Sequence, residues 1–129
     1  MLSEPTRALA RGKNFAAFTT LLPGGQPMTH VMWVDCDDEH ILINTETHRT
    51  KFANVGRDPR VTVTIIDRSN PYRYAEVRGE VAETVTGPAA RRHIDELSQK
   101  YMGTPYQGRI QSERVILRIK PKRDRVGGG

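Results

Sequence analysis

The stretch between residues 41 and 66 limits what this chain can fold into more than any other. It begins with the apolar run 41–44, passes through a polar turn into a short basic segment, 48–56, and stops at Asp58-Pro59. Residues 61–66 follow at once and are mostly β-branched, which favours a strand. The pattern predicts a strand, a turn, a short helix and a second strand, in that order.

The predicted turn carries the groups of an anion site. Hydrogen-bonding side chains stand beside two cations at the expected start of a helix: Asn44, Thr45, Thr47, Arg49, Thr50 and Lys51. Such a strand-to-helix junction suits a phosphate, because backbone N–H groups and cations converge there. Alone, the two cations would be typical of a solvent-exposed helix face. Their flanking residues favour the phosphate interpretation.

The rest of the chain is also mainly strand-like. Further strands are predicted at 14–22, 27–35, 72–84 and 113–119, and helices at 2–12 and 87–102. Ser3 and Pro88 are typical of helix starts, and Gly79 inside a long strand indicates a bulge. The turns at 23–26 and 36–39 predict two consecutive hairpins, hence a meander. The basic, glycine-ended tail, about 121–129, is predicted to fray.

These elements predict a mainly β fold, with about six antiparallel strands and two helices inserted between them. Closing such a sheet into a small barrel removes its exposed edges. A length of 129 residues without repeat or linker predicts one domain, 1–129. Aromatic residues make up only 6% of the chain, so the core is modest and a dimer would add burial.

Composition narrows the function classes. The net charge of +5 favours an anionic ligand without separating a nucleotide cofactor from a nucleic acid. The single cysteine, Cys36, excludes an intramolecular disulfide and indicates a reducing compartment. The acidic turn around it should raise its pKa and keep the thiol unreactive. The four histidines lack metal-ligand spacing, so no metal is expected. Without a long apolar run or signal region, we expect a soluble cytoplasmic protein with no membrane association.

Three stretches follow one another in a recognisable order: the Gly-Gln-Pro turn with its strand at 25–34, the segment 44–54 followed by Arg57-Asp-Pro-Arg60, and the segment 70–79. Together they resemble the split-barrel flavin and deazaflavin oxidoreductases related to pyridoxamine phosphate oxidase. The last, with Asn70-Pro-Tyr-Arg-Tyr74, is similar to the branch that uses the deazaflavin coenzyme F420. The likeness covers roughly residues 10 to 120. It implies a six-stranded antiparallel split barrel, a homodimer with cofactors at the subunit interface, and hydride transfer to a small unsaturated organic substrate.

The resemblance also implies a set of cofactor-binding residues. Those expected to flank the ring are His30, Val31, Met32 and Trp33. Those expected at the phosphate or ribityl chain are Asn44, Thr45, Arg49, Lys51 and Asn54. Tyr72 and Tyr74 would approach the ring from the neighbouring subunit. Phe52-Ala53 stands where the family often has another basic residue. No side chain can be named as catalytic.

Several functions remain open at this point. The leading hypothesis is an F420-dependent reductase, and the nearest alternative keeps the fold but binds FMN. A β-barrel that binds single-stranded nucleic acid is disfavoured, because the aromatic residues are few and do not interleave with the basic ones. A carrier that binds the cofactor without turnover is a further alternative. The basic stretch 109–125 is either a solvated strand and tail or, with F420, attracts a polyglutamylated cofactor tail.

Overall fold

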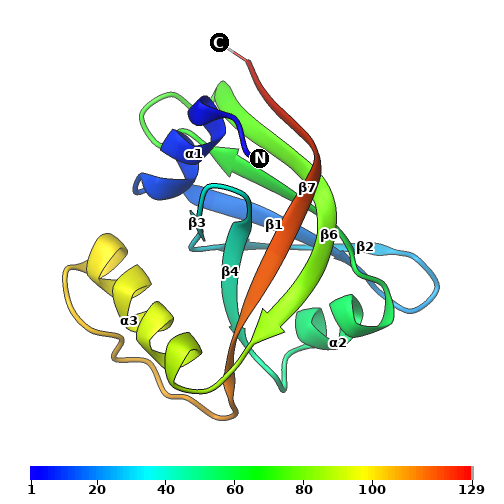
Figure 1. The fold of residues 1–129 in the computed structure, drawn as a ribbon, viewed down its shortest axis with the longest axis vertical. Coiled ribbons are helices and arrows are strands. Elements are labelled where there is room, and N and C mark those ends of the chain that lie inside the picture. Colours follow the sequence, from blue (N-terminus) through cyan, green and yellow to red (C-terminus); the bar gives the residue numbers. More distant parts are fainter. Residues whose placement is uncertain (129) are drawn as a thin grey trace.

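One curled antiparallel sheet forms the body of the molecule, as a computed structural model that describes residues 1–128 shows (Figure 1). The elements in chain order are α1 (Glu4–Arg11), β1 (Phe15–Leu21), β2 (Pro27–Met32), β3 (Asp35–Cys36), β4 (Ile41–Glu46), α2 (Thr50–Arg57), β5 (Arg60–Ile66), β6 (Arg73–Val85), α3 (Pro88–Met102) and β7 (Arg114–Gly128). The helices α2 and α3 lie at one end of the barrel, and α1 lies near the other (Figure 1). Among the described residues, no helix has the length and apolar character needed to cross a membrane.

The order of the strands explains why the sheet must curl. The order is β2-β1-β5-β6-β7-β4-β3, so β2 and β3 lie at its opposite ends. Only Trp33 and Val34 separate these two strands in the chain. A connection this short can join both ends only if the sheet wraps round on itself. The predicted mainly β, split-barrel fold is therefore confirmed.

The predicted strand 27–35 differs in the structure. It is broken after Met32, which raises the strand count from the predicted six to seven. Its first part pairs with β1 and its second part with β4. Both predicted hairpins are therefore confirmed, but the middle strand that they were expected to share is split, so they do not form a continuous meander. The break lies where Trp33 stacks on Tyr101 of α3 and the Val34 N–H donates to the Tyr101 hydroxyl at 3.1 Å. These contacts turn the chain away from β1.

The predicted frayed tail is also wrong for the described residues. Strand β7 continues to Gly128 and pairs with β6 along its length, from Val85 opposite Ile116 to Arg73 opposite Gly128. A long partner strand supplies ladder hydrogen bonds to a tail whose own sequence is polar. The predicted bulge at Gly79 is confirmed by a register shift there. A Cβ at Gly79 would collide with the backbone carbonyl of Lys120, so a side chain does not fit.

Local signals place the helix ends. Ser3 caps α1 by accepting the Thr6 N–H at 3.3 Å, and Pro88 starts α3, as predicted. The predicted end of the short basic helix at Gly56 is wrong, since α2 continues to Arg57 and closes when the Asp58 N–H donates to Asn54. Gly56 therefore lies inside the helix rather than beyond it.

The core has two parts. The inward faces of β1, β4, β5, β6 and β7 fill the barrel with side chains such as Phe18, Ile43, Val63, Val77 and Leu117. A smaller cluster belongs to α3 and consists of Ile94, Leu97 and Tyr101, with Trp33 and Tyr106 packed against it. The helix α3 thus packs beside the barrel through an apolar cluster that is separate from the barrel core.

Candidate functional site

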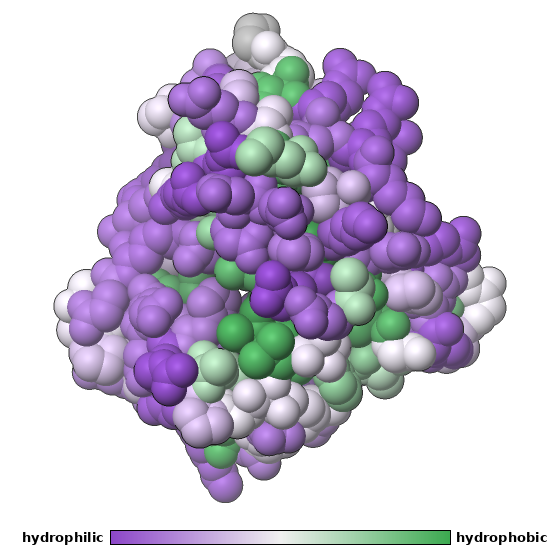
Figure 2. All heavy atoms as spheres, in the orientation of Figure 1, coloured by the Kyte–Doolittle hydropathy of each residue, from purple (hydrophilic) through white to green (hydrophobic). Residues whose placement is uncertain are grey.

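A cavity of about 680 Å³ opens between β2, the start of α2, α3 and the start of β7. Its walls are Phe15, Thr29, His30, Val31, Met32, Trp33, Asn44, Arg49, Lys51, Ile94, Leu97, Tyr106 and Arg114. Figure 2 shows hydrophobic atoms gathered around a hollow near the middle of the viewed face, with strongly hydrophilic atoms directly beside them. The cavity has the same two-part character, with an apolar wall and a cationic wall.

The cationic wall holds more positive than negative charge. Lys51 and Arg114 are each only 6% exposed, and Arg49 lies beside them. Among residues 1–128, the carboxylate that pairs with these cations is that of Glu46, which lies 3.3 Å from Arg49 and 3.4 Å from Arg114. Among the described residues, Lys51 has neither an ion pair nor a hydrogen-bond partner for its side chain. A largely buried lysine that lines the cavity without a partner of opposite charge suits an anionic ligand at this wall.

The titration behaviour of these groups agrees with their surroundings. Burial lowers the pKa of Lys51, and the nearby Arg49 and Arg114 guanidinium groups lower it further. Burial alone would raise the pKa of Glu46, but the backbone N–H groups of Ser112 and Gln111 and the two guanidinium groups outweigh it, so that pKa is lowered. Glu46 therefore stays ionised and holds its partners. An incoming anion would stabilise the charged form of Lys51.

Asn44 is held by bonds within the protein. Its amide nitrogen donates to the Ala90 carbonyl and to His93 Nδ1, both at 3.0 Å. Its amide oxygen accepts the Nε–H of Arg114 at 2.8 Å. Both amide N–H groups are thus engaged before any ligand binds. In this structure Asn44 lines the cavity mainly as a support for Arg114, and its direct contact with a cofactor stays a prediction.

The apolar wall is flat and aromatic. Trp33 stacks on Tyr101 with ring centroids 5.2 Å apart and planes 5° apart. Tyr106 meets Trp33 edge-on at 6.3 Å, and its ring lies 5.3 Å from the Arg114 guanidinium carbon. Ile94 and Leu97 complete this side from α3. A slot with stacked aromatic and aliphatic walls suits a planar ring system.

Most of the predicted site residues come together here. The seven that line the cavity are His30, Val31, Met32, Trp33, Asn44, Arg49 and Lys51. Thr45 and Asn54 are buried behind the wall, and the Asn54 amide donates to the Thr20 hydroxyl at 3.0 Å. Tyr72 is 77% exposed in the turn before β6, and Tyr74 packs near Gly127. Neither tyrosine lines the cavity of this chain, so their approach from a neighbouring subunit stays a prediction.

The structure adds wall residues that were not among the predicted cofactor-binding residues. These are Phe15, Thr29, Ile94, Leu97, Tyr106 and Arg114. Ile94 and Leu97 fit the apolar face of a helix, but nothing local shows that part of this face borders a cavity. Arg114 opens a strand of alternating pattern and looks like a solvent-facing position. Its approach to Asn44 depends on the pairing of β4 with β7, a long-range feature.

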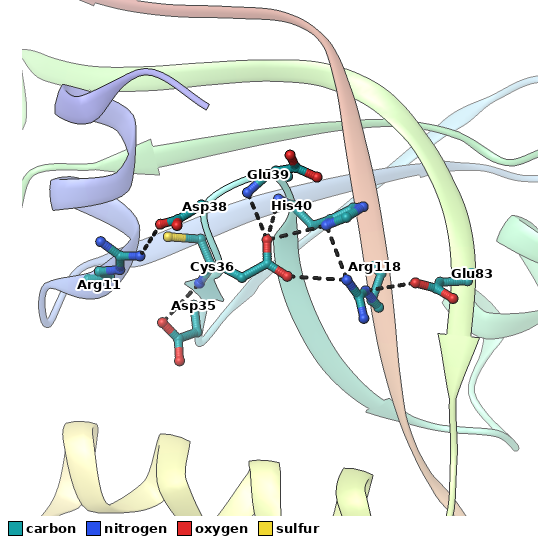
Figure 3. A network of polar contacts seen from close by, with 9 residues as sticks. Arg11, Asp35, Cys36, Asp38, Glu39, His40, Glu83 and Arg118 are labelled. Atoms are coloured by element: carbon teal, nitrogen blue, oxygen red, sulfur yellow. Dashed lines mark hydrogen bonds and ion pairs between the residues drawn. The ribbon is translucent and has the colours of Figure 1, made fainter. Parts of the chain in front are cut away.

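A second group of charges lies at the hairpin between β3 and β4, outside the cavity (Figure 3). Arg118 pairs with Asp37 at 3.3 Å and with Glu83 at 2.9 Å, and Arg11 pairs with Asp38 at 3.0 Å. In residues 1–128, no group of three or more His, Cys, Asp or Glu side chains is arranged to hold a metal ion. The basic residues Arg123 and Arg125 of β7 pair with β6 at the end of the molecule near α1 and are not part of the cavity wall.

Cys36 lies inside this hairpin region. Burial raises its pKa to about 11, with smaller contributions from Asp35 and Asp37. The predicted rise in pKa is confirmed, but burial contributes more to it than the acidic turn does. The thiol therefore remains protonated at neutral pH.

Comparison with known proteins finds one matching family and several similar solved structures. The model of the family described as Pyridoxamine 5'-phosphate oxidase matches residues 2–125. A solved structure of an F420 reductase is 29% identical, covers 96% of this chain and 98% of its own, and superposes with a TM-score of 0.83. Conserved hypothetical protein Rv2991 from Mycobacterium tuberculosis is 26% identical, with 99% and 86% of the two chains covered and a TM-score of 0.78.

More distant structures share the fold. General Stress Protein 26 from Bacillus anthracis is 16% identical, with 95% and 91% of the two chains covered and a TM-score of 0.71. A search of curated proteins finds no match to this sequence. The family match over nearly the whole chain confirms the resemblance read from the sequence, and it agrees with the curled sheet and its cavity. The chain belongs to the pyridoxamine 5'-phosphate oxidase family, whose split-barrel fold serves flavin and deazaflavin oxidoreductases.

Proposed function

We propose that this protein is an F420-dependent oxidoreductase that transfers a hydride between the deazaflavin and an electron-poor double bond of a small organic substrate. The observation that carries the proposal is the largely buried Lys51 side chain, which has no ion-pair partner among the described residues and lines a cavity whose other lining residues include the apolar Trp33, Ile94 and Leu97. The first feature fits a phosphate, and the second fits a tricyclic ring.

The residues present fit such a group from end to end. Lys51, Arg49 and Arg114 would hold the phosphate, and they outnumber the single carboxylate of Glu46. Trp33, Met32 and Leu97 would border the ring and exclude water from its face. Bound F420 supplies the hydride from C5 of its ring. The protein orients the ring through the slot and fixes its position through the phosphate, so that the chemistry is the cofactor's.

Two observations favour F420 over FMN, although both carry a phosphate and a ring of this shape. The solved F420 reductase is similar over nearly the whole of both chains. The segment Asn70-Pro-Tyr-Arg-Tyr74 is similar to the deazaflavin branch of the family. An FMN-binding oxidoreductase of the same fold is the second candidate, and the cationic wall of the cavity supports it equally.

We also propose a homodimer in which the partner covers the open side of the cavity. Val31 is 72% exposed and Phe15 is 40% exposed, although both line the cavity and are apolar. Strand β2 is an end strand of the sheet order, so no other strand of residues 1–128 pairs with its outer edge. A second copy would bury these side chains and complete the slot.

A substitution in β2 tests the shared site. Val31→Glu should give a monomer in analytical ultracentrifugation and weaken cofactor binding, whereas Val31→Thr, of similar size, should keep the dimer. The physical reason is the cost of burying a carboxylate in an apolar interface. A Val31→Glu monomer that still binds cofactor as tightly as the wild type would contradict the shared-site proposal.

The cofactor itself is tested by fluorescence titration of the purified protein with F420 and with FMN side by side. A labelled single-stranded oligonucleotide serves as a third arm. Tight binding of F420 alone supports the proposal, and tight binding of FMN alone replaces the electron donor but keeps the site. If neither cofactor binds in the micromolar range, the phosphate assignment fails, and binding of the oligonucleotide would then favour the nucleic-acid hypothesis.

A further inference from the structure

We propose that His93 is a positioning residue that acts through Asn44 to keep the Arg114 guanidinium turned toward the cavity. The inference rests on the proposed function only for the identity of the anion, because the contacts themselves lie within the protein. It concerns three side chains from three elements, namely α3, β4 and β7.

The contacts form a continuous chain. His93 Nδ1 lies 3.0 Å from the Asn44 amide nitrogen, and the Asn44 amide oxygen lies 2.8 Å from Arg114 Nε. The exposed fractions of the three residues are 6%, 5% and 6%, respectively. Water therefore has little access to replace either bond, and loss of one partner leaves the next polar group unsatisfied.

The direction of each bond follows from the chemistry of Arg114. The Nε–H of an arginine can only donate, so the group facing it must be the amide oxygen of Asn44. The amide nitrogen then faces His93 and donates, which leaves His93 Nδ1 as an acceptor without a proton. The proton of the neutral imidazole is consequently on Nε2, which is buried and has no hydrogen-bond partner among residues 1–128.

An unpaired Nε2 argues that His93 does more than fill space. A side chain that served only packing would be better without a buried N–H that lacks a partner. The Nδ1 atom, by contrast, fixes which way round the Asn44 amide lies. The reverse orientation would place the amide N–H groups against the Arg114 Nε–H, donor against donor.

Arg114 is held on several sides by these contacts. Asn44 accepts at Nε, Glu46 pairs with Nη1 at 3.4 Å, and the Tyr106 ring covers the guanidinium at 5.3 Å. With these contacts in place, Arg114 lines the cavity. A fixed guanidinium binds an anion with less loss of side-chain entropy than a free one.

The charges around His93 keep it in the neutral form that this arrangement needs. Burial lowers its pKa most strongly. Asp35 of β3 and Glu96 of α3 act in the opposite sense, whereas Lys100 of α3 and Arg114 of β7 lower the pKa further. At neutral pH the imidazole is therefore uncharged and its Nδ1 can accept.

A matched pair of variants tests the proposal. His93→Asn can place an amide oxygen near the position of Nδ1 and keep the acceptor, whereas His93→Leu removes it. Nitrogen-15 NMR of the protein without ligand should show a slowly exchanging Arg114 Nε–H signal in the wild type and in His93→Asn. The signal should exchange rapidly in His93→Leu. Arg114→Lys has no Nε–H at this position, so the signal that disappears in this variant is assigned to Arg114.

Titration with F420 and with FMN gives the second readout. The dissociation constant of the cofactor that binds should rise roughly tenfold in His93→Leu, as for the loss of one hydrogen bond to a charged group, and stay close to the wild-type value in His93→Asn. A protected Arg114 signal together with wild-type affinity in His93→Leu would overturn the proposal. If neither cofactor binds the wild type but the Arg114 signal still depends on His93, the positioning role stands and the proposed function fails.

The wild type alone offers a check should His93→Leu not fold. Nitrogen-15 shifts of the His93 ring distinguish the two neutral tautomers. A proton on Nε2 supports the proposal, and a proton on Nδ1 would overturn it.

Discussion

Two groups of charges in this molecule look alike in sequence and differ in structure. The group around the β3–β4 hairpin joins Arg118 to Asp37 and to Glu83 in partly exposed pairs, and Figure 3 shows the pair with Glu83. The group at the cavity joins Arg49 and Arg114 to the buried Glu46 and leaves Lys51 without a partner. The charges at the hairpin pair with one another. The cations at the cavity outnumber the carboxylate that pairs with them, so an anionic ligand would be needed to balance them.

This difference distinguishes solvent-accessible ion pairs on the surface from buried charges that line a candidate binding site. Exposed pairs contribute little, because water solvates each member well without its partner. The stability of buried charges depends on each partner, because water cannot reach them to replace a lost hydrogen bond. The number of charged residues therefore says less about function than whether each buried charge has a partner. Four predictions, ordered by expected effect, test this comparison.

Glu46→Ala should give the largest loss of stability. Removal of its carboxylate leaves Arg114 buried without its ion pair and the backbone N–H groups of Gln111 and Ser112 without an acceptor. Loss of one partner from a buried pair costs about 3–5 kcal/mol of unfolding free energy. Urea unfolding followed by circular dichroism measures it. A loss of unfolding free energy smaller than about 1 kcal/mol, as expected for an exposed pair, would contradict the distinction between the two groups of charges.

The double variant Arg49→Ala, Lys51→Ala should weaken cofactor binding without a comparable loss of stability. Each charge-assisted hydrogen bond to a phosphate contributes about 1.5–3 kcal/mol to the binding free energy. Fluorescence titration measures the effect. Arg60→Ala, which removes an exposed cation paired with Asp58, is the matched control and should bind as the wild type does. Unchanged affinity in the double variant would remove the phosphate assignment.

Acidification should destabilise the protein through His93. Its pKa in the folded protein lies below the ordinary value of about 6.5, mainly because it is buried. As the pH falls below that value, the unfolded chain takes up a proton that the folded chain does not, so stability falls, by at most about 1.4 kcal/mol per pH unit. The loss continues until the pH reaches the folded pKa. His93→Asn should flatten this part of the curve in urea unfolding at a series of pH values, and an equally steep curve would contradict the assignment.

Glu83→Ala should have the smallest effect. Its side chain is 56% exposed, and its pair with Arg118 at 2.9 Å is one of two that this arginine makes. The unfolding free energy should change by less than about 1 kcal/mol, since solvent screens such pairs. High salt should reduce the effect further. A loss as large as that of Glu46→Ala would show that the hairpin charges are not a surface feature.

The sequence predicted those features of the fold that depend on local chemistry. Ser3 caps α1, Pro88 starts α3 and Gly79 marks a bulge, because each residue type satisfies a requirement of its own backbone position. The pairing of residues that lie far apart in the chain was harder to predict from the sequence. The polar stretch after Lys120 becomes a strand only because β6 is long enough to pair with it. The break at Trp33 depends on contacts with α3, which lies more than fifty residues further along the chain.

The candidate site follows the same division. Arg49, Lys51 and the β2 residues were found because they stand together in the chain with a recognisable order. Arg114 was missed because its meeting with Asn44 depends on strand register, which composition does not reveal. Tyr72 and Tyr74 were predicted from a family in which the site is shared between subunits, so one chain alone does not test them.

The short connection between β2 and β3 has a consequence for folding. Met32 and Asp35 belong to the two outermost strands of the sheet order, so their neighbours in the barrel must be assembled before this connection can lie in place. Pairings between distant segments form late, because the entropy of closing the intervening loop opposes them. The same connection carries Trp33, a wall of the cavity. We therefore expect the cavity to be completed only when the barrel closes, and a bound ligand to stabilise the closed barrel.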